Sequence, residues 1–389
     1  MNSKFILKTL QRIGAAILCI SLLFTVFVGC KDDNGNGGGG HDHDNDFHGI
    51  DLDAAMATFA PDTVMIKAGE AEITWAELYV IVFNIAYSVS NGFTEEIDWD
   101  EEYIIGTPLI ETAMEVLTEQ ALELLVYEYA VNLLGLSLSQ EEYDIIQTDI
   151  EAMIEMIKID EDIENLEEYL HDIGFIDIDV FRKLREREFA PWLLLTELYG
   201  EDIIDFPDEG VAEFAKEQEF MRAQHILFKI LTEEEGASEA EIEESKIEKL
   251  AAAEDVLAQL TEHKDDEDFI DLFRFLMTEH SEDPGSFSSP NGYLFQPYHM
   301  VAPFSAAAAA LEYNHISGIV TTDYGYHIIL RLPIDYDANP VGERYSLRQL
   351  ALLHDFGTKV EQWQDAMPTE FTAEFNSINL REIFAWCDH

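Results

Sequence analysis

The sequence predicts an α+β protein, in which a helical domain is combined with a small domain whose antiparallel-type sheet is flanked by helices. Segments 220–230 and 318–332 are rich in branched and aromatic residues at short spacing, bounded by Gly and Asn, as in buried strands. Helical periodicity dominates instead between residues 108 and 199. The two strand patterns enclose two helical patterns and a loop rich in Gly, Pro and Ser, an order typical of a small α+β domain.

Length and charge limit the possible functions. The chain has 389 residues, of which 47% are hydrophobic and 26% charged, so two or three packed units can form. It carries 22 basic against 79 acidic residues, for a formal net charge of −57. Binding to a phosphate backbone needs clustered Lys and Arg, so we expect no nucleic-acid partner. The charge favours solubility and attraction to basic proteins.

The first residues have the layout of a secretory signal peptide. Lys4, Lys8 and Arg12 precede an uncharged apolar run over 13–28. The run ends at Phe27-Val28-Gly29-Cys30, which resembles the lipobox of bacterial lipoproteins. This resemblance implies a signal peptide over 1–29, lipidation of Cys30, and a membrane anchor on the extracytoplasmic face. An uncleaved anchor is the alternative, although the run is shorter than the ~20 residues that a spanning helix prefers.

Residues 30–61 are predicted to be a flexible linker, because residues 34–40 consist of Gly and Asn alone. A polar cluster follows, with His41, His43 and His48 among aspartates. Imidazole and carboxylate groups can hold Zn²⁺ or Ni²⁺, and a metal-capture lipoprotein is one reading of this cluster. A solvated polar linker is the other reading. Because the cluster lacks fixed spacing or a scaffold, we expect no metal site.

Residues 62–217 are predicted to form the helical domain. A hairpin over 64–73 turns at Ala68-Gly69, and Thr74 with Glu77 forms a capping box for the helix that follows. A long helix starts at Pro108 and ends at Gly135. Further helices follow a second capping box at Ser139 and Glu142 and cover 180–199.

The apolar stripes of these helices allow two interpretations, a core that packs inward or a cradle that binds client proteins, and packing inward is the usual arrangement. A basic cluster on the last helix is interpreted as offsetting carboxylates of the same helix rather than binding a ligand. It consists of Arg182, Lys183, Arg185 and Arg187.

Separated motifs in the second domain occur in one order. Arg-Ala-Gln-His-Ile-Leu at 222–227 is followed by Ser-Glu-Asp-Pro-Gly at 281–285 and Met-Val-Ala-Pro-Phe at 300–304, then by an Ala-rich helix and the last strand. This series resembles parvulin-type (PpiC) peptidyl-prolyl isomerases, and it implies a parvulin domain over 218–335. The hairpin and helices over 62–216 resemble the chaperone domain of SurA and PrsA foldases. That resemblance implies that residues 336–389 return to pack on the helical domain.

The parvulin resemblance also implies the site. Its polar centre would consist of His225, Asp283, Thr322 and His327, and its proline slot would be lined by Leu294, Phe295, Met300, Phe304 and Tyr324. Rotation about an X-Pro amide breaks no bond, so the site needs only to bind the twisted amide better than the planar forms. We expect no cofactor. Asp283 and the histidines would act electrostatically. The alternative is that the two histidines are structural and satisfy each other.

The resemblance implies a peptidyl-prolyl isomerase and chaperone that assists folding of exported proteins. Its partners would be unfolded or partly folded exported chains with X-Pro bonds, and a homodimer is possible. A catalytically weak holdase lipoprotein that only binds clients is the alternative. Glu233-Glu234-Glu235 stands where phosphate-reading parvulins carry basic residues. We therefore expect general or basic-sequence substrates rather than phosphorylated ones.

Overall fold

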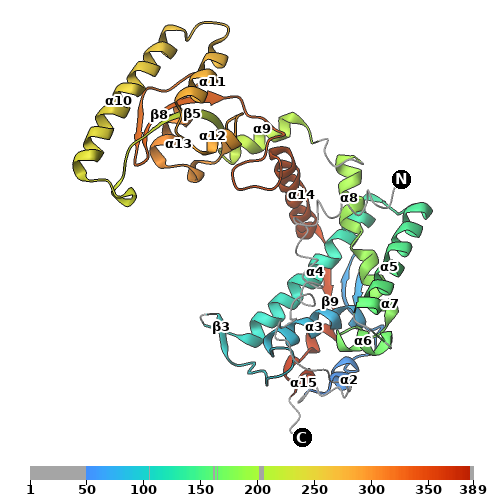
Figure 1. Ribbon diagram of the computed structural model, residues 1–389. Coiled ribbons are helices and arrows are strands. Elements are labelled where there is room, and N and C mark those ends of the chain that lie inside the picture. Colours follow the sequence, from blue (N-terminus) through green and yellow to red (C-terminus); the bar gives the residue numbers. More distant parts are fainter. Residues whose placement is uncertain (1–49, 105, 161–162, 164, 201–205, 386–389) are drawn as a thin grey trace. The chain divides into compact units, whose positions relative to one another are not determined.

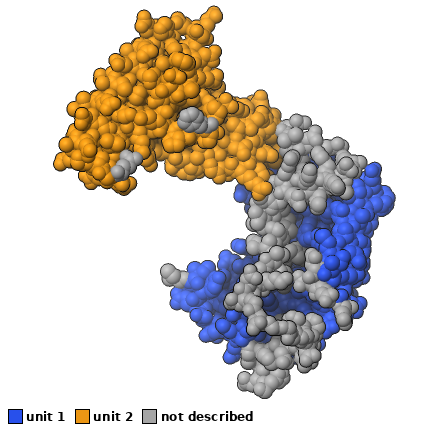
Figure 2. Space-filling view, in the orientation of Figure 1, with its two compact units in different colours: residues 1–202, 356–389 blue, residues 203–355 orange. Residues whose placement is uncertain are grey.

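The computed structural model describes residues 50–104, 106–160, 163, 165–200 and 206–385 (Figure 1). The fold is α+β, mostly helical with antiparallel sheets, as the sequence predicts. Two compact units form: residues 1–202 with 356–389, and residues 203–355 (Figure 2). The predicted signal peptide, Cys30 and the histidine cluster of the linker lie outside the described residues. Within the described ranges, no helix combines the length and the apolarity needed to cross a membrane.

A three-stranded sheet anchors the first unit. Strands β1 (Val64–Ala68) and β2 (Ala71–Thr74) form the predicted hairpin, and β9 (Thr369–Phe371) pairs antiparallel with β1, giving the order β2-β1-β9. The turn between β1 and β2 uses Gly69 at φ +64°, a conformation that glycine adopts without strain. A segment close to the C-terminus therefore completes a sheet that begins near residue 64.

Helices α3 (Trp75–Val89) and α4 (Leu109–Leu134) pack on this sheet, and the other helices of the first unit follow them or flank the sheet strands in the sequence. These other helices are α2 (Leu52–Met56), α5 (Gln140–Asp160), α6 (Leu166–Asp172), α7 (Ile178–Arg187), α8 (Ala190–Tyr199) and α15 (Leu380–Ile383). A small hairpin of β3 (Glu102–Ile104) and β4 (Thr107–Pro108) precedes α4. Helix α14 (Leu347–Ala366) contains the boundary between the two units.

Helix α2 lies in the segment predicted as the end of the linker. Asp51 caps it by accepting the N–H of Ala54 at 2.9 Å, and Ala55 is buried. The indole N–H of Trp75 donates to the carbonyl oxygen of Met56 at 2.8 Å. The folded part of the chain therefore begins by Ile50, rather than at Asp62.

The single helix expected over 180–199 is two helices, α7 and α8, separated at residues 188–189. The cause is Pro191, which lacks an N–H and whose ring would collide with the carbonyl of the preceding turn in a continuous helix. In the structure Pro191 lies in the first turn of α8, where a missing N–H leaves no bond unmade.

The interpretation of the basic cluster on α7 is wrong for Lys183 and Arg187, whereas Arg185 pairs with Glu188 at the end of the same helix and Arg182 pairs with both Asp179 of α7 and Glu151 of α5. Glu77 of α3 is 1% exposed and receives hydrogen bonds from Lys183 at 3.0 Å and from Arg187 Nε at 2.9 Å. Arg187 also pairs with Glu128 of α4. A buried carboxylate must be paired, and here the capping box of α3 supplies the buried acid that α7 neutralises. The cluster therefore joins helices to each other.

The second unit is built on a four-stranded antiparallel sheet in the order β6-β5-β8-β7. Its strands are β5 (Met221–Lys229), β6 (Tyr293–Phe295), β7 (Val320–Thr322) and β8 (Gly325–Leu332). Its helices are α9 (Asp208–Glu217), α10 (Glu239–Glu262), α11 (Phe269–His280), α12 (Gly285–Ser288) and α13 (Ala302–Ala310). Ser238 and Glu241 form a capping box at the start of α10.

The two faces of this sheet carry separate apolar clusters. Ile226 and Phe228 of β5 pack with Ile328 and Leu330 of β8 and with residues of α10 and α11. Met221 and Ala223 face the other way with Phe295 of β6, Ile329 of β8, and Phe304 and Ala308 of α13. Because side chains alternate along a strand, His225 points to the α13 face.

Candidate active site

Two histidines meet on the α13 face of the sheet. His225 lies on β5 opposite Ile329, and His327 lies on β8 opposite Leu227, so the histidines are diagonal neighbours across antiparallel strands. Their Nδ1 atoms are 3.3 Å apart, and both residues are buried. The strand register brings together the two histidines that the sequence singled out.

Asp283 reaches His225 from the turn that follows α11. The backbone N–H of Leu227 donates to the Ser281 hydroxyl at 3.1 Å, and the N–H of Glu282 donates to the Leu227 carbonyl at 2.8 Å. These bonds attach the turn to β5. Oδ2 of Asp283 lies 2.9 Å from Nε2 of His225, and Oδ1 accepts the N–H of Gly285 at 3.2 Å. The carboxylate is therefore held by its own turn before any substrate binds.

Thr322 closes the other end of the histidine pair. Its hydroxyl oxygen lies 2.8 Å from Nε2 of His327 and accepts the backbone N–H of Tyr324 at 3.1 Å. An ionised carboxylate only accepts, so His225 Nε2–H donates to Asp283. When both rings are neutral, His327 Nδ1–H then donates to His225 Nδ1, and the Thr322 hydroxyl donates to His327 Nε2. With donation in this one direction, from Thr322 towards Asp283, every hydrogen bond in the series has one donor and one acceptor.

Burial and hydrogen bonding set the charges. Burial lowers the pKa of His327 to about 4, and the neighbouring His225 acts in the same direction, so His327 is neutral near pH 7. Burial by itself raises the pKa of Asp283, but the hydrogen bonds from His225 and Tyr293 outweigh this and bring it to about 2. Asp283 is therefore ionised over the physiological range, as the direction of donation requires.

An apolar cluster lies beside the histidines. The ring centroid of Phe304 is 5.1 Å from that of His225 and 5.6 Å from that of His327, in edge-to-face geometry. Phe295 packs against Phe304 at 5.9 Å, and Met300 packs against the same cluster. Phe304 therefore connects both imidazole rings to an apolar cluster that includes Phe295 and Met300.

Two expected slot residues lie elsewhere. Leu294 is buried but adjacent to Phe295 in β6, so the alternation of side chains places it on the opposite face of the sheet. The side chain of Tyr324 is 57% exposed, and its backbone N–H is the group that reaches the site. Geometry therefore supports Phe295, Met300 and Phe304 in the slot better than Leu294 and Tyr324.

Sequence reasoning missed Tyr293. Its hydroxyl donates to Oδ2 of Asp283 at 2.6 Å, and its ring meets His225 edge-to-face at a centroid distance of 5.8 Å. Burial, and then the Asp283 charge, raise the pKa of Tyr293, so the phenol keeps its proton. The sequence contained the information needed to find it. Side chains alternate along a strand, so residues 293 and 295 lie on one face of β6 and Leu294 lies on the other.

A family model described as the rotamase PPIC-type PPIase domain matches residues 225–332. The match begins at the first histidine and contains the other residues of the polar centre. Residues 225–332 are a PpiC-type parvulin domain. The rest of the chain lies outside this match, and the wider boundaries 218–335 stay a prediction.

The chain has distant homologues among PrsA foldases. It is 31% identical over 176 residues to the foldase protein PrsA of Geobacillus sp. (strain WCH70), covering 44% of this chain and 54% of that protein. It is 43% identical over 79 residues to PrsA of Geobacillus kaustophilus (strain HTA426), covering 20% and 25%. The chain thus spans about half or less of the length of these relatives.

Solved structures give the same kind of match. The crystal structure of PrsA from Bacillus subtilis is 20% identical and covers 79% of this chain and 92% of that one, with a TM-score of 0.23. The solution structure of TbPIN1 is 31% identical and covers 30% and 98%, with a TM-score of 0.22.

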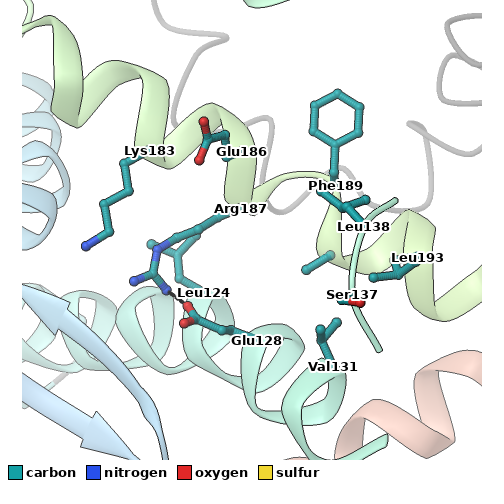
Figure 3. Close-up of a pocket in the computed structure, with 11 residues that line it drawn as sticks. Leu124, Glu128, Val131, Ser137, Leu138, Lys183, Glu186, Arg187, Phe189 and Leu193 are labelled. Carbon is teal, nitrogen blue, oxygen red and sulfur yellow. Dashed lines mark hydrogen bonds and ion pairs between the residues drawn. The ribbon is translucent and has the colours of Figure 1, made fainter. Parts of the chain in front are cut away.

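A second candidate site is a cavity of about 330 Å³ in the first unit, where α4, α7 and α8 meet (Figure 3). Arg187 and Glu128 form an ion pair on one side of it, and Lys183 lies on the same helix as Arg187. Half-buried apolar side chains make up much of the remaining wall, namely Val131, Leu138, Phe189 and Leu193. The apolar stripe of α4 otherwise packs inward, at Leu117, Ala121 and Leu125.

Proposed function

We propose that the parvulin domain catalyses cis-trans isomerisation of X-Pro peptide bonds and that the protein assists the folding of exported proteins. One observation carries the proposal: a continuous hydrogen-bonded chain from Asp283 through His225 and His327 to Thr322 lies against the apolar cluster of Phe295, Met300 and Phe304. A proline ring needs an apolar slot, and its amide carbonyl needs fixed polar groups nearby. The two requirements meet at the rings of the histidines.

The chemistry needs no covalent step. The barrier to rotation about the amide is ~18–20 kcal/mol because the planar forms are stabilised by resonance. A site accelerates rotation by binding the twisted amide more tightly than either planar form. In this proposal Phe295, Met300 and Phe304 hold the ring, while Asp283 and the histidine pair present dipoles of fixed direction to the carbonyl as its charge changes. The reaction requires no cofactor.

The cellular setting follows from the N-terminus. The signal peptide over 1–29 and lipidation of Cys30 would place the folded units on the extracytoplasmic side of the membrane, where exported chains emerge unfolded. The net charge of −57 favours basic clients and disfavours nucleic acid. Replacing Cys30 with Ala should abolish incorporation of labelled fatty acid and release the protein from membranes. Unchanged membrane retention would contradict lipid anchoring.

Isomerisation of a short unphosphorylated X-Pro peptide tests the enzyme. We expect acceleration above the spontaneous rate, with large losses in His225→Ala and Met300→Ala. Phe275→Ala is a matched control, because Phe275 is 60% exposed on α11, on the other side of the sheet. Circular dichroism would confirm that the variants stay folded. No acceleration for several residues before proline would refute the catalytic proposal.

The cavity of the first unit favours a second candidate function, that of a holdase. Its half-buried apolar wall can take an apolar side chain of an extended client, with polar groups of α7 beside it. Leu138→Asp should then weaken suppression of client aggregation. Leu133→Asp is the control, because Leu133 is 57% exposed on α4 outside the cavity wall. Equal activity of the two variants would argue against this cavity as a client site.

A further inference from the structure

Tyr293 is tied to the polar centre by several independent contacts. Its hydroxyl donates to Oδ2 of Asp283, the same oxygen that lies 2.9 Å from Nε2 of His225. Its ring also packs edge-to-face on the His225 imidazole. In the strand register Tyr293 lies opposite Ala223 at one end of β6. The position of Tyr293 in β6 thus places its phenol beside both the Asp283 carboxylate and the His225 imidazole.

The turn below Tyr293 leaves room for its hydroxyl only because residue 285 is glycine. A Cβ atom at Gly285 would collide with the Tyr293 hydroxyl oxygen. The backbone N–H of Gly285 meanwhile donates to the other carboxylate oxygen of Asp283. Gly285 therefore serves both oxygens of Asp283, directly at Oδ1 and by making space for the phenol at Oδ2.

We propose that Tyr293 is a positioning residue of the isomerase site, whose hydroxyl orients Asp283 and thereby fixes the direction of hydrogen-bond donation through His225 and His327. The inference deepens the proposed function and rests on it for the rate effect. With the phenol donating to Oδ2, the carboxylate holds one rotamer and His225 Nε2 keeps its proton. His225 Nδ1 is then left to accept from His327.

Loss of the Tyr293 hydroxyl should weaken the orientation of Asp283 while the aromatic ring stays in place. The titratable groups that face Asp283 are His225 from β5 and Tyr293 from β6, with His327 of β8 behind His225. In Tyr293→Phe the ring still packs on His225, but Asp283 loses one donor. A hydrogen bond to a charged group is strong enough that the carboxyl pKa should rise by roughly one unit.

The first experiment measures tautomers in the purified protein by nitrogen-15 NMR of labelled histidine. In the wild type we expect neutral His225 protonated at Nε2 and neutral His327 protonated at Nδ1. In Tyr293→Phe the ionised carboxylate is free to turn away from His225, so the tautomers should become mixtures, and kcat/KM should fall roughly 3- to 10-fold with its acidic limb moved to higher pH. Tyr298→Phe is the matched control, because Tyr298 is 73% exposed and its hydroxyl bonds Gln296 rather than Asp283.

Two further variants separate positioning from packing. Tyr293→Phe in an Asp283→Asn background should have little additional effect, because the phenol acts through Asp283. Gly285→Ala should reproduce the tautomer change by displacing the phenol. Unchanged tautomers in Tyr293→Phe, or equal losses with and without Asp283, would overturn the inference. Since the tautomers are read without substrate, an inactive wild type would refute the proposed function while leaving this result to be decided separately.

Discussion

His327 should make the stability of the parvulin domain depend on pH between 6.5 and 4. The ring is 3% exposed, and burial together with the His225 charge lowers its pKa to about 4 from 6.5. The folded state therefore binds a proton less readily than the unfolded state. This group leaves the stability unchanged above pH 6.5, lowers it steadily as the pH falls from 6.5 to 4, and has no further effect below pH 4. At 1.36 kcal/mol per pKa unit, the loss amounts to about 3 kcal/mol.

The assay must report on the second unit. All five tryptophans of the sequence lie outside residues 203–355, so their fluorescence follows the first unit. Hydrogen exchange of peptides from β5 and β8, corrected for intrinsic rates, would follow the second. His327→Asn removes the titrating group, so the decrease in unfolding free energy between pH 6.5 and pH 4 should be smaller by about 3 kcal/mol than in the wild type. Asp283 adds no slope in this range, because its pKa is about 2. An identical slope in wild type and variant would refute the reasoning.

Three further changes give distinct expectations. Glu77→Ala leaves two basic partners without their buried carboxylate and should destabilise the first unit by about 3–5 kcal/mol in urea unfolding followed by tryptophan fluorescence. Gly325→Ala places a Cβ against the carbonyl of Phe228 at φ +139°, and it should destabilise the second unit by about 1–3 kcal/mol, seen as faster exchange in β8. Wild type should prefer Lys-Pro to Glu-Pro peptides at low salt, because the chain carries a net charge of −57. Raising the salt concentration should remove that preference.

Features that depend on a few neighbouring residues could be predicted from the sequence. The capping boxes at Thr74–Glu77 and Ser139–Glu142 form as expected, because a cap needs only residues three apart. The hairpin at Gly69 follows for the same reason. The meeting of His225 and His327, 102 residues apart, could not be derived from local pattern alone. It came from the order of separated motifs.

Residues whose role depends on which face of a strand they occupy were missed or assigned wrongly. Choosing Leu294 together with Phe295 overlooked that neighbours in a strand face opposite sides, and the same oversight hid Tyr293. The break before α8 was visible in Pro191, but the apolar periodicity over 180–199 was given more weight. The partners of Glu77 required knowledge of which helices pack together, and helical periodicity does not contain that information.

The two halves of the candidate site are built differently, and this bears on how it can work. Asp283 is held by bonds from its own turn, from β5 and from β6, and the histidines are held by each other and by Thr322. Groups fixed in this way need no reorganisation when the charge on a bound amide changes, which is the condition for electrostatic stabilisation. Met300, in contrast, is half-buried and flexible, and it can adapt to different proline neighbours. A rigid polar end and an adaptable apolar end suit a catalyst that must accept many sequences while stabilising one geometry of the amide.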